Sequence, residues 1–170
     1  MNLLARLFRS APEPREALRP LWHKVVEISR EPEWYAQCGV ADTVAGRFDM
    51  ITAVLALALL RLERDEGCRP QASLLTELFV EDMDGQLRES GVGDIVVGKH
   101  VGKLMASLGG RLGAYRAALA GEASLEDALR RNVTLPEGRG PEVLAERLRV
   151  LAGQLDGTAT DEVLAGRIER

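Results

Sequence analysis

The sequence is poor in aromatic residues, which make up only 4% of its 170 positions. Strands are enriched in aromatic and β-branched residues, whereas helices favour Ala, Leu and other residues that lose little freedom in a helix. Ala and Leu are abundant here, and almost no segment alternates polar and apolar residues with the period of two that a half-buried strand shows. The composition argues against a β-sandwich and predicts an all-α protein, with 46% hydrophobic residues available for a core.

Residues that bind metals are also scarce, with two cysteines, Cys38 and Cys68, and two histidines, His23 and His100. No Cys-x-x-Cys or His-x-x-x-His motif occurs, so no metal site is expected. Both cysteines stand in or beside apolar stretches, which favours reduced thiols in a cytosolic protein over a disulfide. The motifs of nucleophilic hydrolases, phosphate-binding loops and dinucleotide sites are missing too. We therefore expect no enzyme activity, no cofactor and no small-molecule substrate.

The chain also lacks a long apolar run and an excess of basic charge. Its longest apolar run, residues 51–60 (ITAVLALALL), is half of the ~20 residues that cross a bilayer. The run instead predicts a buried central helix. The net charge of −4 argues against a dedicated nucleic-acid-binding protein. No secretory signal is recognisable, so a cytoplasmic location is expected.

Residues 1–19 read as a basic amphipathic segment followed by a proline-containing linker. Its apolar and basic residues, spaced as on a helix, are Leu3, Leu4, Leu7 and Phe8 with Arg6 and Arg9. Such a segment can lie on an anionic membrane surface. The alternatives are a frayed terminus or a helix that docks on the rest of the protein.

Residues 20–170 are expected to form one compact all-α domain of six to eight helices. Apolar residues recur every three or four positions, as amphipathic helices require. The expected helices cover residues 20–30, 43 or 47 to 65, 71–89 and 97–119, with three shorter ones at 124–132, 141–155 and 161–168. Gly109 and Gly110 are a weak point that could divide the helix at 97–119.

An acidic run, Glu81-Asp82-Met83-Asp84, stands within the expected helix at 71–89. On a helix, Asp82 and Asp84 are about 200° apart around the axis, so they cannot both face one cation. An acidic recognition face is therefore favoured over a metal site. A helical enzyme that uses these carboxylates as acid–base groups is a weaker alternative.

Small residues recur along the next helix, at Gly98, Gly102, Ala106, Gly109 or Gly110 and Gly113. Small side chains let another backbone approach closely, either within the domain or in a partner. Internal packing is the more common reason for such a pattern. A docking surface is nevertheless favoured by the basic residues interleaved with it, which are Lys99, His100, Lys103, Arg111 and Arg116.

Two blocks of sequence resemble the ubiquinol–cytochrome c chaperone family. The first is residues 42–50 (DTVAGRFDM), and the second is residues 79–94 (FVEDMDGQLRESGVGD) followed by 97–101 (VGKHV). The resemblance covers about residues 21–119, while the remainder matches only in being helical and polar-faced. It implies an all-helical, non-enzymatic chaperone that helps newly made cytochrome b enter the respiratory cytochrome bc complex.

The resemblance also implies a client-binding surface on the second block, with part of the first. The implied residues are Asp82, Asp84, Gln86, Arg88, Gly91, Gly93, Asp94, Lys99 and Lys103, joined by Arg47 and Asp49. Arg47 and Asp49 could instead form a buried structural pair. The implied partner is cytochrome b, with the ribosome or the inner membrane surface as further contacts. The alternative function is an all-α adaptor that binds a soluble partner through its acidic helix.

Overall fold

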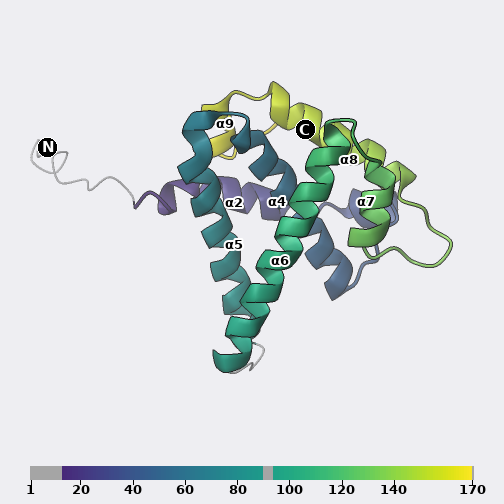
Figure 1. The fold of residues 1–170 in the computed structure, drawn as a ribbon, viewed down its shortest axis with the longest axis horizontal. Coiled ribbons are helices and arrows are strands. Elements are labelled where there is room, and N and C mark those ends of the chain that lie inside the picture. The colour runs from purple at the N-terminus through teal and green to yellow at the C-terminus, as the bar shows by residue number, and fades with distance from the viewer. Residues whose placement is uncertain (1–12, 90–93, 170) are drawn as a thin grey trace, which may run out of the picture.

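The computed structural model describes residues 13–89 and 94–169, which form an all-α protein (Figure 1). This confirms the predicted fold class. The α-helices are α2 (Arg19–Ser29), α3 (Pro32–Ala36), α4 (Val44–Glu63), α5 (Arg69–Glu89), α6 (Asp94–Leu119), α7 (Leu125–Asn132), α8 (Glu142–Gly157) and α9 (Thr160–Leu164). Two short 3-10 helices, η1 (Glu16–Leu18) and η2 (Glu66–Cys68), precede α2 and α5. The amphipathic residues 3–9 lie outside the described part of the chain.

Helix α4 is the central element of the fold. Its N-terminus is capped by Thr43, whose side chain accepts a hydrogen bond from the Gly46 amide. Every residue from 51 to 60 is buried, because α2, α5, α6 and α8 all contact this helix. The sequence-based prediction of a buried central helix is confirmed.

Gly46 is required by close packing at the start of α4. A Cβ atom at this position would lie 1.9 Å from the Ala41 carbonyl oxygen, far inside van der Waals contact. The loop before α4 therefore folds tightly against the first turn of the helix.

Helices α2 and α3 pack beside α4 and are joined by specific hydrogen bonds. Trp34 is buried in α3, and its Nε1 donates to the Ile28 carbonyl at 2.6 Å. Trp22 of α2 meets Phe79 of α5 edge to face, with ring centroids 6.0 Å apart. These contacts fix α2 against α5.

Helices α7, α8 and α9 complete the body of the protein. Arg61 near the end of α4 donates to the carbonyl oxygens of Leu155 and Thr158 and to Thr160 Oγ1, each at 2.9–3.0 Å. Near the C-terminus, Gly166 has a φ of +70°, and a Cβ there would lie 2.5 Å from the Pro20 carbonyl oxygen. The last described turn is therefore packed against the first turn of α2.

The sequence-based expectation of free thiols is met, because Cys38 and Cys68 are both free and buried. Burial raises the pKa of each thiol, which keeps it protonated and unreactive. Helix α6 differs from expectation in one respect: it continues through Gly109 and Gly110 without a break.

Candidate functional site

Helices α5 and α6 form an antiparallel pair whose shared end projects from the body (Figure 1). Beyond Met83 in α5, residues 84–86, 88 and 89 are not buried. In α6, no residue from 99 to 107 is buried, and the buried positions are Leu108, Arg111 and Tyr115 near the body. We call this part, residues 80–89 and 94–107, the projecting hairpin.

Asp82 and Asp84 of the hairpin are each held by a neighbour on the same helix. Arg88 Nε donates to Asp84 Oδ2 at 2.7 Å, and Gln86 Nε2 donates to Asp82 Oδ2 at 3.4 Å. Such pairs at a spacing of four residues contribute about 0.2–0.5 kcal/mol each. They organise the surface of α5 and leave its carboxylates accessible.

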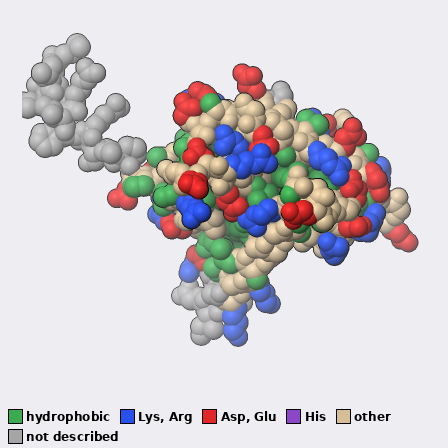
Figure 2. Space-filling view, turned by 45° about the horizontal axis from the view of Figure 1, so that its top comes forward, with side chains coloured by type: hydrophobic (Ala, Val, Ile, Leu, Met, Phe, Trp, Pro, Cys, Tyr) green, Lys and Arg blue, Asp and Glu red, His purple; other side chains and the backbone are tan. Residues whose placement is uncertain are grey.

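The remaining predicted site residues of the second block belong to α6 or to the segment that precedes it in the sequence. Lys99 and Lys103 are on α6, and both are exposed. Asp94 is the first residue of α6. Gly91 and Gly93 lie outside the described residues. Figure 2 shows one face of the projection, where a tan surface of backbone and other side chains extends down to basic side chains near its lower end.

The small residues of α6 form an open strip on the helix surface. At 100° per residue, four small residues fall within about 60° of arc around the helix axis, namely Gly102, Ala106, Gly109 and Gly113. All four are exposed, and a Cβ added at any of the three glycines would meet nothing within 4 Å. We call this face the small-residue strip. Its exposure removes the alternative that these glycines serve packing inside the domain.

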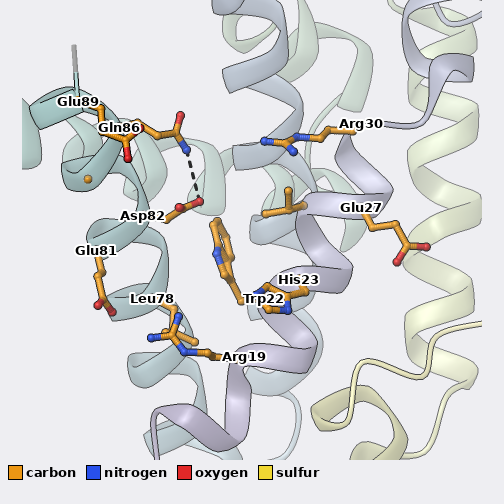
Figure 3. A pocket seen from close by; sticks show the side chains of 12 residues that line it. Arg19, Trp22, His23, Glu27, Arg30, Leu78, Glu81, Asp82, Gln86 and Glu89 are labelled. Atoms are coloured by element: carbon orange, nitrogen blue, oxygen red, sulfur yellow. Dashed lines mark hydrogen bonds between the residues drawn. The ribbon is translucent and has the colours of Figure 1, made fainter.

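A groove between α2 and α5 lies beside the hairpin (Figure 3) and has a volume of about 860 Å³. Trp22, 4% exposed, lies between the two helices, and Asp82 and Gln86 of the predicted site line the α5 side. Arg19 and Arg30 line the α2 side, so charges of both signs face the groove. Such a groove suits a polypeptide with apolar and charged groups.

The structure places the predicted site residues on different faces. Asp82 and Gln86 line the α2–α5 groove, whereas Asp84 lines a separate groove that includes Met105 of α6. Neither groove is lined by Lys99 or Lys103. The contribution of α2 to the first groove was not predicted, because in the sequence Trp22 is one of several apolar residues with helical spacing.

Arg47 and Asp49 do not form the pair that the sequence offered as an alternative. Arg47 is exposed and donates to Asp42 at 2.7 Å. Asp49 is buried and accepts from Arg111 Nη2 at 2.5 Å and from the amide and hydroxyl of Thr134 at 2.8 and 2.7 Å. Its carboxylate is therefore enclosed by the protein rather than presented on the client-binding surface.

Arg111 is the residue that analysis of the sequence assigned to the wrong environment. It was counted among the basic residues that flank the small-residue strip, yet it is 7% exposed. Besides Asp49, it donates to the Asn132 carbonyl at 2.9 Å and to Ser107. Its spacing from Leu108 and Tyr115 places it on the buried face of α6, and this signal was available in the sequence.

Among residues 13–89 and 94–169, no three His, Cys, Asp or Glu side chains gather in a way that could hold a metal ion. No helix within the same residues is both long and apolar enough to cross a membrane.

Comparisons with known proteins agree with this architecture. The family model of the ubiquinol–cytochrome C chaperones matches residues 36–169. The match includes the C-terminal third, to which the sequence resemblance did not extend. The chain is also similar to the crystal structure of the Cbp3 homolog from Brucella abortus, with 30% identity, 98% of this chain and 95% of that chain covered, and a TM-score of 0.79. No curated protein matches the sequence.

Proposed function

The chain belongs to the ubiquinol–cytochrome c chaperone family, and we propose that it binds newly made cytochrome b before this subunit enters the reductase complex. An assembly chaperone of ubiquinol–cytochrome c reductase is the function that the family supports. The identity of the client, the surface that holds it and the cellular location are the parts that we propose here. We further propose that the protein acts by binding alone, without catalysis.

The observation that carries the proposal is the small-residue strip, which begins on the projecting hairpin and continues along α6 to Gly113. A strip of exposed Gly and Ala permits close approach of a second helix, because no side chain separates the backbones. Each exposed glycine also lowers helix stability by about 1 kcal/mol relative to Ala. Internal packing does not offset this cost, since a Cβ atom added at Gly102, Gly109 or Gly113 would meet nothing within 4 Å. Close contact with an apolar helix of the client is a reason to keep them small.

Charged groups beside the strip complement this contact. Lys99 and Lys103 are exposed on α6, the helix that carries the strip. Newly made membrane helices carry charged residues at their ends, and pairing with such groups sets orientation and association rate more than affinity. A client held in this way can be released to the membrane, because small side chains and exposed ion pairs give modest binding.

The proposed location is the cytoplasmic face of the inner membrane, where cytochrome b is inserted. The motive is the apolar and basic pattern of residues 3–9. Contact with the translating ribosome is a further proposal, since the client is bound as it is made. Removal of residues 1–12 is expected to reduce sedimentation with anionic liposomes and to leave helicity intact.

The test compares two glycines that differ only in position. Gly102 on the strip and Gly153 on α8 are both exposed, lie within helices and have open space around them. Gly102→Leu places a bulky side chain on the strip, whereas Gly153→Leu places it on the body. We expect Gly102→Leu to lower the cellular content of assembled cytochrome bc complex and the amount of cytochrome b that co-purifies, while Gly153→Leu leaves both unchanged.

Cross-linking locates the client directly. A photoreactive residue at position 103 or 106 should capture cytochrome b, and one at the exposed position 150 on α8 should not. Capture from position 150 with none from 103 or 106 would place the client-binding surface elsewhere. Capture of a soluble protein in place of cytochrome b would favour an adaptor function.

A further inference from the structure

A second groove lies on the side of α5 away from the α2–α5 groove that Figure 3 shows. It is lined by Arg15, Glu77, Val80, Glu81, Asp84 and Met105, and its volume is about 400 Å³. Met105 is 41% exposed, which makes it one of few large apolar side chains on the surface of the described residues. We call this hollow the α5–α6 groove. It has an apolar floor and an acidic rim.

The groove leads to the point where the described chain begins. Glu13 and Pro14 line an adjoining hollow together with Leu74 and Glu77 of α5. Arg15 and Glu77 border both hollows. Residues 1–12 therefore join the described chain at the edge of this acidic and apolar surface.

The sequence of the N-terminal segment complements that surface. Residues 3–9 combine four large apolar side chains with two arginines, and no acidic residue interrupts them. One basic residue from the same end of the chain already lies on the acidic rim, because Arg15 is 3.7 Å from Glu81. Arg6 and Arg9 of the segment carry the same guanidinium group, which can pair with further carboxylates of the rim.

We propose that residues 3–9 dock into the α5–α6 groove of their own chain, with Leu7 and Phe8 on Val80 and Met105. Arg6 and Arg9 then face the acidic rim. The docking goes beyond the chaperone function proposed above and requires no client.

The distances permit this docking. From Glu13 back to Phe8 the extended chain reaches about 17 Å, since each residue spans about 3.3 Å. The groove and its adjoining hollow follow α5 from Leu74 to Asp84, a rise of about 15 Å at 1.5 Å per residue. A segment tethered by so short a linker has an effective concentration in the millimolar range, so even weak contacts keep it bound.

Docking gives the N-terminal segment two alternative positions, the groove and an anionic membrane. While the segment is docked, Met105 is covered and the apolar stripe is withheld from lipid. A membrane or another ligand must displace it. The groove then limits attachment of the chaperone to anionic surfaces.

The test uses the full chain with a benzophenone amino acid in place of Phe8. After irradiation, we expect cross-links to the peptides that contain Val80 and Met105. A mixture of ¹⁵N-labelled and unlabelled protein shows whether each link joins one chain or two. Glu77→Lys should reduce the cross-link yield several-fold. Glu146→Lys, the same change at an exposed glutamate of α8, should leave it unaltered.

Each result decides for or against the docking. Links within one chain that are lost in Glu77→Lys support it, provided that circular dichroism shows the variant folded. Links between two chains would make a second copy the occupant and overturn the proposal. Links spread over the surface, or a yield indifferent to Glu77→Lys, would overturn it too. Position 8 could also capture lipid from phosphatidylglycerol vesicles and form no cross-link to the groove when vesicles are absent. That result would make the membrane the docking site of the segment and overturn the proposal.

Discussion

The buried contact between Asp49 and Arg111 should be the strongest single polar determinant of stability in this protein. It joins α4 to α6. Through Asn132 and Thr134 it also holds the end of α7 and the segment that follows this helix. The side chains of Asp49 and Arg111 are only 10% and 9% exposed. Arg111→Met removes the guanidinium, keeps most of the length of the side chain and leaves the carboxylate buried.

The expected loss is set by the charge that remains. Removal of one partner from a buried ion pair typically costs about 3–5 kcal/mol, because the other charge is left without compensation. For a domain of this size, 1 kcal/mol corresponds to about 2–4 °C in the melting temperature, so the shift should be roughly 6–20 °C. Thr134 still donates to Asp49 in the variant, which favours the lower part of that range.

A matched control is provided by Arg47, which pairs with Asp42 on the surface. Both side chains of this pair are more than half exposed, and such pairs contribute about 0–1 kcal/mol. Arg47→Met should therefore shift the melting temperature by only a few degrees. Asp49→Leu combined with Arg111→Met should cost less than the sum of the two single changes, because no charge remains buried in the double variant.

The measurement is thermal and urea unfolding followed by far-ultraviolet circular dichroism. Equal destabilisation by Arg111→Met and Arg47→Met would refute the reasoning. So would strict additivity in the double variant, since it would show that the two charges do not interact.

Three further predictions concern the core. Leu55→Asp should abolish the cooperative melt, because an unpaired charge would be buried at the centre of α4 and cost several kcal/mol; a folded variant would show that the position is not central. Gly46→Ala should destabilise the protein, although Gly→Ala in a helix usually stabilises, because its Cβ would lie 1.9 Å from a carbonyl oxygen. Gly153→Ala, where the added Cβ would meet open space, should stabilise the protein by up to about 1 kcal/mol. If urea unfolding gave both variants a stability change of the same sign, the packing argument would be contradicted. Burial raises the pKa of Tyr115 to about 12, so between pH 10 and 12 the unfolded chain loses this proton and the folded chain does not. Stability should therefore fall as the pH rises through this window, and Tyr115→Phe should reduce that fall, which urea unfolding at several pH values measures; an unchanged fall would assign it to other groups.

The helices were predictable because their signals are local. Apolar residues at a spacing of three and four, with Pro and Ser at the starts of helices, determine the bounds of α4, α5 and α7 to within a few residues. The predicted start of the helix at 124 agrees with the cap of α7, where the Ser124 hydroxyl accepts a hydrogen bond from the Asp127 amide at 3.1 Å. Only α9 is clearly shorter than expected, since it ends at Leu164.

Pairing between distant residues could not be predicted in the same way. Arg111 meets Asp49 across 62 positions of sequence, and a charged residue on α6 gives no local sign of its partner. The role of the glycines in α6 depended on whether another helix covers them, which only the tertiary structure decides. The sequence therefore identified the candidate segment 79–103, while the structure separated its exposed groups from its buried ones.

The contact between Gly166 and Pro20 has a consequence for how the protein is made. It joins the last described turn to the first turn of α2, so the two ends of the domain must be present before its core is closed. During translation, α2 emerges well before the turn at Gly166. The contact between them therefore has a very high sequence separation and forms late. The core should therefore close only after α9 and Gly166 have been made, and ribosome-bound fragments that end before α9 should remain open and protease-sensitive.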